Sequence, residues 1–316
     1  MLPRTFTILI CTRNRAETLN YCLEKHKQIE DPIGTVRDYI FVDNGSTDNT
    51  QEIILDFQKN TRWKVQYILE SRLGHSIALN RGCKRAEGDF IAFTDDDAIP
   101  EVDWLTQINR VIDEFDADWV FGPVEPIWSG SGAPRWYGEE TSGLLACFSH
   151  GKDEYISYDM RKSFAGVNHC CKKSSLFSLA LYDELLGLRG AATIGGNDDD
   201  LYRRALASGC RLVYSPLVRV RHIISRDRLC ERVHLKNAWN LGRNEASYIN
   251  LSKRFPFSLF GIPYFLIRRC LFHQWFWIEG FIFQNHSRAF HHKLRFIRAL
   301  STIWTLIKFR FGYRPD

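Results

Sequence analysis

The chain lacks the patterns that mark several common classes of protein. Nine cysteines are scattered over 316 residues without a C-x-x-C pair, so neither a disulfide framework nor a zinc site is predicted, and this usage fits a reducing compartment. No uncharged apolar stretch reaches the roughly 18 to 20 residues that span a bilayer, and the longest candidate, 255–267, contains two prolines. The early apolar run, 6–11, is shorter than the hydrophobic region of a secretory signal and predicts a strand.

The chain does have an alternation of apolar runs and helix-period segments, with 45% hydrophobic residues to fill a core. The predicted strands are 5–11, 39–42, 65–69, 90–93 and 119–121, and the predicted helices lie near 16–28, 48–59, 74–86 and 103–115. This order predicts an α/β fold with a mainly parallel sheet. A Pro/Gly/Trp-rich stretch, 122–136, predicts a long loop that opens a second half, in which a helix is predicted at 198–208 and a strand at 211–214.

Three consecutive carboxylates, Asp95, Asp96 and Asp97, follow the fourth predicted strand. Adjacent like charges are costly unless a positive group neutralises them. Mg²⁺ or Mn²⁺, held by one or two carboxylates and by diphosphate oxygens, is the usual solution, and the carboxyl ends of parallel strands are where open α/β sheets bind ligands. The alternative interpretation is a solvated acidic turn that caps the next helix. No G-x-x-x-x-G-K-[ST] motif is present, which argues against a P-loop ATPase.

Three other residues each allow a functional and a structural interpretation. Asp43 ends the second predicted strand, where its carboxylate could accept hydrogen bonds from a nucleobase or a ribose. Asp198 opens a predicted helix, where it is either an ordinary N-terminal acid or a general base for an acceptor hydroxyl. His222 is either a metal or phosphate ligand or a structural histidine. None of the three is decided by its own position.

Several short segments add to these residues, in a fixed order along the chain. They are Ile8-Leu-Ile-Cys-Thr12-Arg-Asn14-Arg15 with Glu17, Val42-Asp43-Asn-Gly-Ser-Thr-Asp48, Gly74 with Ala78 and Asn80-Arg-Gly82, Thr94-Asp95-Asp96-Asp97 with Pro100 and Trp104, Gly122-Pro-Val, Gly166-Val-Asn168, Gly195-Gly-Asn-Asp198 and Val220-Arg-His222. Each segment is weak alone, but their order and spacing resemble the inverting family 2 glycosyltransferases with the glycosyltransferase-A fold. The resemblance covers roughly residues 4–245.

The resemblance implies a role for each candidate residue. The implied nucleotide-sugar-binding residues are Thr12, Arg13, Glu17, Asp43, Arg72, Asn80, Asp95 and Asp96, of which Thr12, Glu17 and Asp43 would line the nucleoside pocket. Asp95 and Asp97 would be the acids of the family's D-x-D motif, and Asp97, Asp95 and His222 would bind Mn²⁺ or Mg²⁺. Asp198 would be the catalytic base of an inverting transfer from a nucleotide diphosphate sugar, with a UDP-sugar as the expected donor.

The chain departs from the family pattern at a few positions. Asn197 stands where Glu is common, so Asp198 and Asp199 both remain candidates for the base. Leu79 replaces a common Arg, whose place Arg72 or Arg81 could take. The Q-x-x-R-W signature of processive synthases is absent, which favours transfer of one residue per encounter. The alternative function is a catalytically silent nucleotide-sugar-binding or scaffolding protein of the same fold.

Basic charge is concentrated at the C-terminal end. Residues 253–316 contain eleven Lys or Arg and two acids, interleaved with aromatic and aliphatic residues. Short helices of this kind suit burial at an anionic membrane surface; alternatively they close the core or form a dimer contact. Nucleic acid is not expected as a partner, because the aromatic residues sit in long apolar runs and no nucleic-acid-binding module is visible.

These observations predict three parts. Residues 1–122 would be a nucleotide-sugar-binding half, 123–252 an acceptor-binding half of the same catalytic domain, and 253–316 a basic aromatic helical region that associates with the membrane. The expected acceptor is a glycan or a lipid-linked glycan in polysaccharide synthesis. The expected location is peripheral, on the cytoplasmic face of the membrane.

Overall fold

The computed structural model describes residues 4–31, 35–130, 132–189, 192–194, 196–252, 258–259 and 262–311. The motif residue Gly195 and the predicted surface cations Lys253, Arg254 and Arg314 lie outside these ranges. The chain forms two compact units. Unit 1 comprises Met1–Ile127 and Cys147–Ile223, and unit 2 comprises Trp128–Ala146 and Ile224–Asp316.

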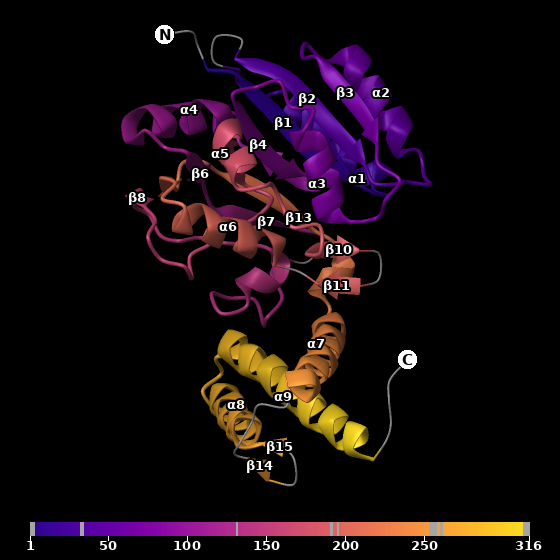
Figure 1. Ribbon diagram of the computed structural model, residues 1–316, viewed down its shortest axis with the longest axis vertical. Coiled ribbons are helices and arrows are strands. Elements are labelled where there is room, and N and C mark those ends of the chain that lie inside the picture. The colour runs from indigo at the N-terminus through magenta and orange to yellow at the C-terminus, as the bar shows by residue number, and fades with distance from the viewer. Residues whose placement is uncertain are drawn as a thin grey trace. The chain divides into compact units, whose positions relative to one another are not determined.

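An eight-stranded sheet forms the centre of unit 1 (Figure 1). Its strands are β1 (Phe6–Thr12), β2 (Val36–Asp43), β3 (Val65–Leu69), β4 (Phe90–Asp95), β6 (Trp119–Phe121), β8 (Tyr155–Ile156), β9 (His169–Lys172) and β12 (Leu212–Tyr214). They lie in the order β3-β2-β1-β4-β9-β6-β12-β8, in which β3, β2, β1 and β4 are mutually parallel and β9 is antiparallel to both neighbours. The predicted α/β class with a mainly parallel sheet is confirmed.

Helices cover both faces of this sheet, as a parallel sheet requires. They are α1 (Ala16–His26), α2 (Thr50–Asn60), α3 (His75–Cys83), α4 (Trp104–Phe115), α5 (Lys173–Ser178) and α6 (Asn197–Ala207). Helix α3 approaches the sheet closely, because a Cβ on Gly82 would come within 2.2 Å of the Leu9 side chain. A larger residue at this position would require the Leu9 side chain to move, so Gly82 lets α3 pack closely on β1.

Side chains along each central strand alternate between two apolar cores. Ile8 and Phe41 belong to one buried cluster, and their chain neighbours Leu9 and Val42 belong to the other. This alternation follows from the two-residue period of a strand. Burial on both sides makes the runs read as almost continuously apolar, and the buried polar residues within them, Thr7 and Asp38, are hydrogen-bonded to each other.

A second, three-stranded sheet lies beside the end of β4. It consists of β5 (Ala98–Pro100), β13 (Val220–Ile224) and β7 (Val124–Trp128), in the order β5-β13-β7. Strand β7 falls within the segment predicted as a long loop, and its pairing partners are distant in sequence.

The buried Asn168 links three segments of this region: its amide donates to the carbonyls of Pro123 and Val218 at 2.8 Å each, and its oxygen accepts from Trp104 Nε1 at 3.0 Å. Strand pairs β10 (Gly187–Arg189) with β11 (Ala192–Ile194), and β14 (Ser258–Leu259) with β15 (Ile262–Pro263), complete the described strands.

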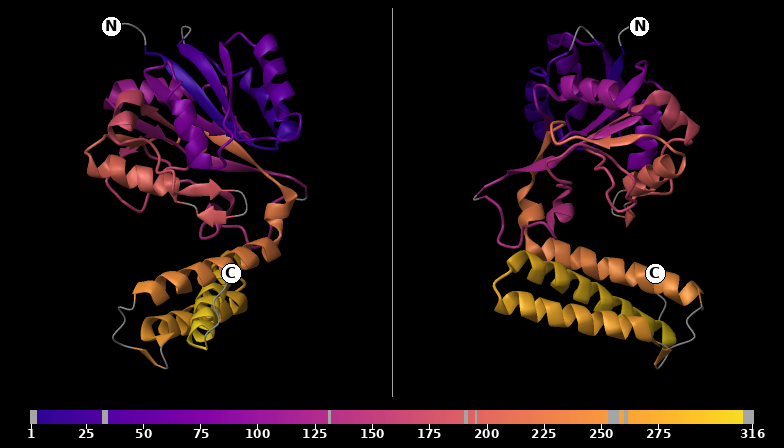
Figure 2. Two further views of the ribbon diagram at one scale, coloured as in Figure 1. Left: turned by 45° about the vertical axis from the view of Figure 1, so that its right-hand side comes forward. Right: turned by 90° about the vertical axis from the view of Figure 1, so that its left-hand side faces the viewer.

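Unit 2 is built on three helices, α7 (Glu231–Ser252), α8 (Tyr264–Ile282) and α9 (His286–Arg310), with single 3-10 turns at Ser142–Leu145 and Arg226–Leu229. Helix α9 packs against both α7 and α8 (Figure 2). The predicted C-terminal helical extension is confirmed, but the expectation of short helices in 253–316 is wrong: α8 and α9 have 19 and 25 residues. The apolar residues of these segments recur at helical spacing on both sides of the Lys and Arg residues, so the cations do not end the helices.

An ion-pair cluster joins these helices. Glu245 on α7 accepts from Arg269 on α8 at 2.8 and 3.0 Å and from Arg298 on α9 at 2.8 Å. Burial alone would raise the pKa of Glu245, but the hydrogen bonds from the two guanidinium groups lower it overall. None of the described helices combines the length and apolar composition needed to cross a membrane.

Candidate active site

The carboxyl ends of three adjacent parallel strands bring polar side chains to one edge of the sheet. Thr12 at the end of β1 pairs in register with Asp43 at the end of β2, and Cys11 pairs with Asp95 at the end of β4. Residues from three sequence segments therefore meet because of strand order alone, as open α/β sheets arrange their ligand sites.

The acidic run continues from β4 into a turn whose two aspartates are buried. Thr12 Oγ1 donates to Asp96 Oδ2 at 2.7 Å. His222 Nε2 lies 3.1 Å from Asp97 Oδ1, because β13 pairs His222 with Ala98, the residue after Asp97. Arg15 donates to the other oxygen of Asp97, and its Nε lies 3.9 Å from Asp96 Oδ1.

The electrostatics of this edge oppose full ionisation. Burial and the neighbouring Asp97 charge raise the pKa of Asp96 to about 7, against partial offsets from Arg15 and Thr12. Burial also raises the pKa of Asp95, against the attraction of His75. A carboxylate whose pKa is raised in this way releases its proton readily when a cation arrives, because the cation removes the repulsion that kept it protonated.

Asp198 lies at the start of α6, at the side of the acidic turn. Burial, followed by the charges of Asp95 and Asp199, raises the pKa of Asp198 to about 7, and a hydrogen bond from the Gly166 backbone opposes the rise. The approach is close: a Cβ on Gly166 would lie 2.6 Å from Asp198 Oδ2. Asn197 Nδ2 donates to Asp198 Oδ1 at 3.1 Å. The carboxylate is thus held from two sides.

The neighbouring candidate, Asp199, has a different environment. Its side chain is exposed and accepts a hydrogen bond from Ser163. Asp199 affects Asp198 through its charge. Of the two residues that the sequence left open, Asp198 is therefore the one that the Gly166 backbone and Asn197 contact.

The predicted nucleoside-binding residues are placed differently from one another. Asp43 is buried, and its two oxygens accept from Tyr67 Oη at 2.9 Å and from the Ser46 backbone at 2.8 Å. Arg13 is exposed just after β1, and Glu17 is exposed in the first turn of α1. Their roles in binding stay predictions.

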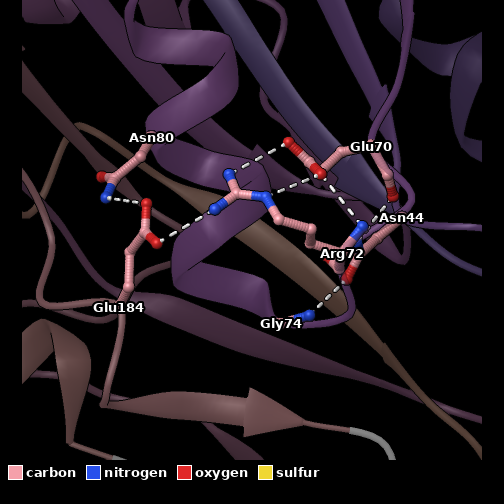
Figure 3. A network of polar contacts seen from close by, with 6 residues as sticks. All are labelled: Asn44, Glu70, Arg72, Gly74, Asn80 and Glu184. Atoms are coloured by element: carbon pink, nitrogen blue, oxygen red, sulfur yellow. Dashed lines mark hydrogen bonds and ion pairs between the residues drawn. The ribbon is translucent and has the colours of Figure 1, made fainter.

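Arg72 and Asn80 belong to a network of polar contacts along α3 and the segment before it (Figure 3). The exposed Arg72 guanidinium lies between two acids, with Nε 3.3 Å from Glu70 Oε1 and Nη1 3.5 Å from Glu184 Oε2. Asn80 Nδ2 lies 3.5 Å from Glu184 Oε1 and donates to the Tyr182 carbonyl at 2.9 Å, while its oxygen accepts from the Tyr182 amide at 3.0 Å. Asn80 therefore fixes the segment before β10, and Arg72 is the exposed cation of this network.

Two residues enter the site that sequence reasoning did not select. Arg15 carries the ion pair with Asp97, and His75 at the first position of α3 contributes an attractive charge to Asp95. A charge balance would have pointed to Arg15, because three adjacent acids need a cation and Arg15 follows a strand that ends beside them. No comparable signal marks His75, whose position depends on how α3 packs.

The residues present fit a divalent cation that a diphosphate shares. Within the described part of the chain, no three His, Cys, Asp or Glu side chains are grouped as a complete metal-binding cage. A complete cage is not required, since Mg²⁺ is usually held by one or two carboxylates together with substrate phosphates and water. Asp97 and His222 supply two adjacent donors, and both interact electrostatically with Asp95.

The fold matches that of solved sugar-transferring enzymes. A mannosyltransferase from Pyrobaculum calidifontis in complex with GDP-Man and Mn²⁺ aligns over 100% of this chain and 77% of its own, with a TM-score of 0.56 and 16% identity. GalNAc-T7 with UDP, GalNAc and Mn²⁺ aligns over 77% of this chain, with a TM-score of 0.55 and 17% identity, and the alignment spans about half of its length, 51%. The sheet and its acidic edge therefore define a protein of the glycosyltransferase-A fold.

The family follows from the sequence. The family model described as glycosyl transferase family 2 matches residues 7–186, more than half of the chain, so the chain belongs to that family. A curated relative, the glucosyl-dolichyl phosphate glucuronosyltransferase of Haloferax volcanii, is 24% identical over 225 residues, which span 68% of each chain. The resemblance noted from the motifs is confirmed.

Proposed function

We propose that this protein transfers a sugar from a nucleotide diphosphate donor to an acceptor hydroxyl, with inversion at the anomeric carbon. One observation carries the proposal: Asp198 and the acidic end of β4 lie close enough for the charge of Asp95 to raise the pKa of Asp198. A base can take the proton of an attacking hydroxyl, and a neighbouring site that neutralises negative charge can stabilise a departing diphosphate.

Asp198 acts as the general base in this proposal. The acceptor oxygen bonds to the anomeric carbon as its proton passes to the Asp198 carboxylate, and the bond from that carbon to the diphosphate oxygen breaks. The Gly166 amide and Asn197 hold the carboxylate in place for this transfer. Because attack and departure occur on opposite sides of the carbon, the configuration inverts.

Asp97, His222 and Asp95 would hold Mn²⁺ or Mg²⁺, and the bound cation would neutralise charge on the departing diphosphate. The adjacency of Asp97 and His222 supports this assignment, as do the two Mn²⁺-containing structures of the same fold. Arg15, which pairs with Asp97 here, is a second source of positive charge at the same place.

The nucleoside would lie against the ends of β1 and β2. Thr12, Asp43 and Glu17 are proposed to contact it, with Arg13, Arg72, Asn80 and Asp96 as the further donor-binding residues. We keep a UDP-sugar as the expected donor, which accords with the UDP in the GalNAc-T7 structure, whereas the mannosyltransferase holds GDP-Man. Because the two structures hold different nucleotides, the identity of the donor's nucleobase is the first property to test.

The acceptor is proposed to be a glycan or a lipid-linked glycan in polysaccharide synthesis. The name of the Haloferax volcanii relative includes a dolichyl phosphate, which supports a lipid-linked acceptor. The basic aromatic helices of unit 2 support work at a membrane surface, with the cytoplasmic face as the proposed location. Residues 1–122 and 123–252 are proposed as the donor-binding and acceptor-binding parts.

A donor panel tests the proposal. Purified full-length protein is incubated with Mn²⁺ or Mg²⁺ and a set of UDP- and GDP-sugars, with and without detergent-dispersed lipid acceptors, and nucleotide diphosphate release is measured. We expect release with one donor, lost in Asp97→Ala and kept in Asp56→Ala, which removes an exposed carboxylate on α2. Nucleotide binding without release under every acceptor would favour the silent binding protein instead.

A further inference from the structure

Helix α8 exposes an unusual amount of apolar surface. Tyr264, Leu271, Trp275, Ile278 and Ile282 are 48–68% exposed. Their spacings of seven, four, three and four residues place them on one face of an α-helix. The face extends over eighteen residue steps, which at about 1.5 Å each give a length of about 27 Å. We call these five residues the α8 stripe.

The opposite face of α8 is packed. Leu266 is fully buried, the Phe276 ring stacks on His292 with centroids 5.1 Å apart, and Trp277 lies 5.7 Å from Phe296. Gly280 is buried against Ala289. Since α9 occupies that face, the stripe is not the side by which α8 joins the core of unit 2.

The sequence that contains α8 and α9 is strongly basic. Residues 262–311 contain eight Lys or Arg and a single acid, Glu279, whose carboxylate is paired with Arg288 at 3.0 Å. Arg268 is exposed and lies on the stripe itself, between Tyr264 and Leu271. An apolar face that carries an exposed cation, and beside which the one acid of α8 is already ion-paired, complements a surface that is apolar inside and negative outside.

We propose that the α8 stripe is a docking surface for an anionic lipid bilayer, in which α8 lies in the plane of the interface. Trp275 and Tyr264 suit the headgroup level, where aromatic side chains are enriched, and Leu271, Ile278 and Ile282 suit the acyl boundary beneath it. Arg268 remains at the phosphates, because a long cationic side chain reaches the surface from an apolar helix face. This inference deepens the proposed work at a membrane surface by naming the contacting residues.

A second copy of this chain fits the stripe less well. A strip about 27 Å long and 10 to 12 Å wide covers roughly 300 Å², whereas a stable interface buries about 800 Å² per partner. Two copies would also place a second Arg268 cation in the contact, and none of the five stripe residues is an acid that could pair with it. A bilayer has neither limitation.

Vesicle flotation with the full chain tests the inference. The vesicles are phosphatidylcholine alone or with one quarter phosphatidylglycerol, in buffer without nucleotide or divalent metal. We expect Leu271→Ser/Trp275→Ser to reduce partition into the anionic vesicles about tenfold or more, with an unchanged circular dichroism spectrum. The matched control, Tyr158→Ser/Leu185→Ser, removes two equally exposed apolar residues from unit 1 and should bind as the unaltered protein does.

A depth measurement gives the second readout. Brominated lipid quenches indole emission, so it should quench the unaltered protein and lose part of that quenching in Trp275→Phe. Equal binding by the stripe variant, equal quenching in Trp275→Phe, or a solution dimer that the stripe variant dissociates would each overturn the inference. Asp97→Ala should bind vesicles normally, so a failure of the proposed chemistry remains distinguishable from a failure of this docking surface.

Discussion

The two units depart from ordinary burial in opposite ways. Unit 1 places its apolar side chains inside and concentrates acids at a partly buried edge, where Asp96 and Asp97 are less than a tenth exposed. Unit 2 exposes large apolar side chains along α8 and places ion pairs between its helices. Buried like charges and exposed aromatic stripes are both costly in isolation. We propose that each marks the surface where its unit meets something outside the chain: a cation and diphosphate for unit 1, and a bilayer for unit 2.

Asp198→Asn should give the largest difference between the activity of unit 1 and the vesicle binding of unit 2. It removes the proposed base but keeps the shape of the side chain, so turnover should fall about 10²- to 10⁴-fold while donor binding is kept. Steady-state nucleotide release and nucleotide binding measure the two effects, and vesicle binding by unit 2 should not change. Asp199→Asn is the matched control, because Asp199 is the exposed neighbour. Equal losses in both variants would remove Asp198 from the role.

A smaller effect should follow from Gly166→Ala, which acts on Asp198 without changing any ionisable group. The added Cβ would lie 2.6 Å from Asp198 Oδ2, so the carboxylate must shift. A displacement of about 1 Å can cost about 10²-fold, and we expect a fall in kcat of about 10- to 100-fold with little change in the donor KM. An Asp198→Asn/Gly166→Ala double variant should be no slower than Asp198→Asn alone. Additive losses would mean that Gly166 acts elsewhere.

The dependence of kcat on pH should report the ionisation of the Asp198 carboxylate. Burial and the charges of Asp95 and Asp199 raise the pKa of Asp198 to about 7. A base works only when deprotonated, so a raised pKa moves its working range upward: kcat should fall by up to about tenfold per pH unit below the pKa and level off above it. Bound metal adds positive charge nearby and should move the midpoint below about 7. A flat profile of kcat between about pH 5 and 8 at saturating metal would contradict this assignment.

The smallest expected effect is a loss of stability that is confined to unit 2. Glu245→Gln leaves Arg269 and Arg298 without their shared carboxylate, and the free energy of unfolding should fall by about 1–3 kcal/mol, with turnover per folded molecule unchanged. Urea unfolding of the full chain measures the loss. Glu231→Gln, which breaks the more exposed pair with Lys293, should cost under about 1 kcal/mol. Equal costs would show that the cluster does not hold the three helices together.

Most of the helices and strands of unit 1 are predictable from local sequence patterns. Strands 65–69 and 119–121 were predicted at their observed bounds, because apolar runs between turn residues are a local signal. Strand β7 was missed, since its partners lie far away in sequence. The candidate residues at strand ends were predictable for the same reason, whereas the Arg15–Asp97 ion pair and the approach of Gly166 to Asp198 depend on tertiary packing. Sequence also showed that the C-terminal part is apolar and basic, but only packing shows which face of α8 is left exposed.

Metal-dependent nucleotide binding tests the central claim most directly. Calorimetric titration of the full chain with UDP and with GDP, in Mn²⁺ and in EDTA, reports whether the acidic end of β4 holds a cation that is shared with a diphosphate. We expect binding of one nucleotide in Mn²⁺ that weakens at least about 100-fold in EDTA and equally in Asp97→Asn. Nucleotide affinity that is the same in Mn²⁺, in EDTA and in the variant would contradict it.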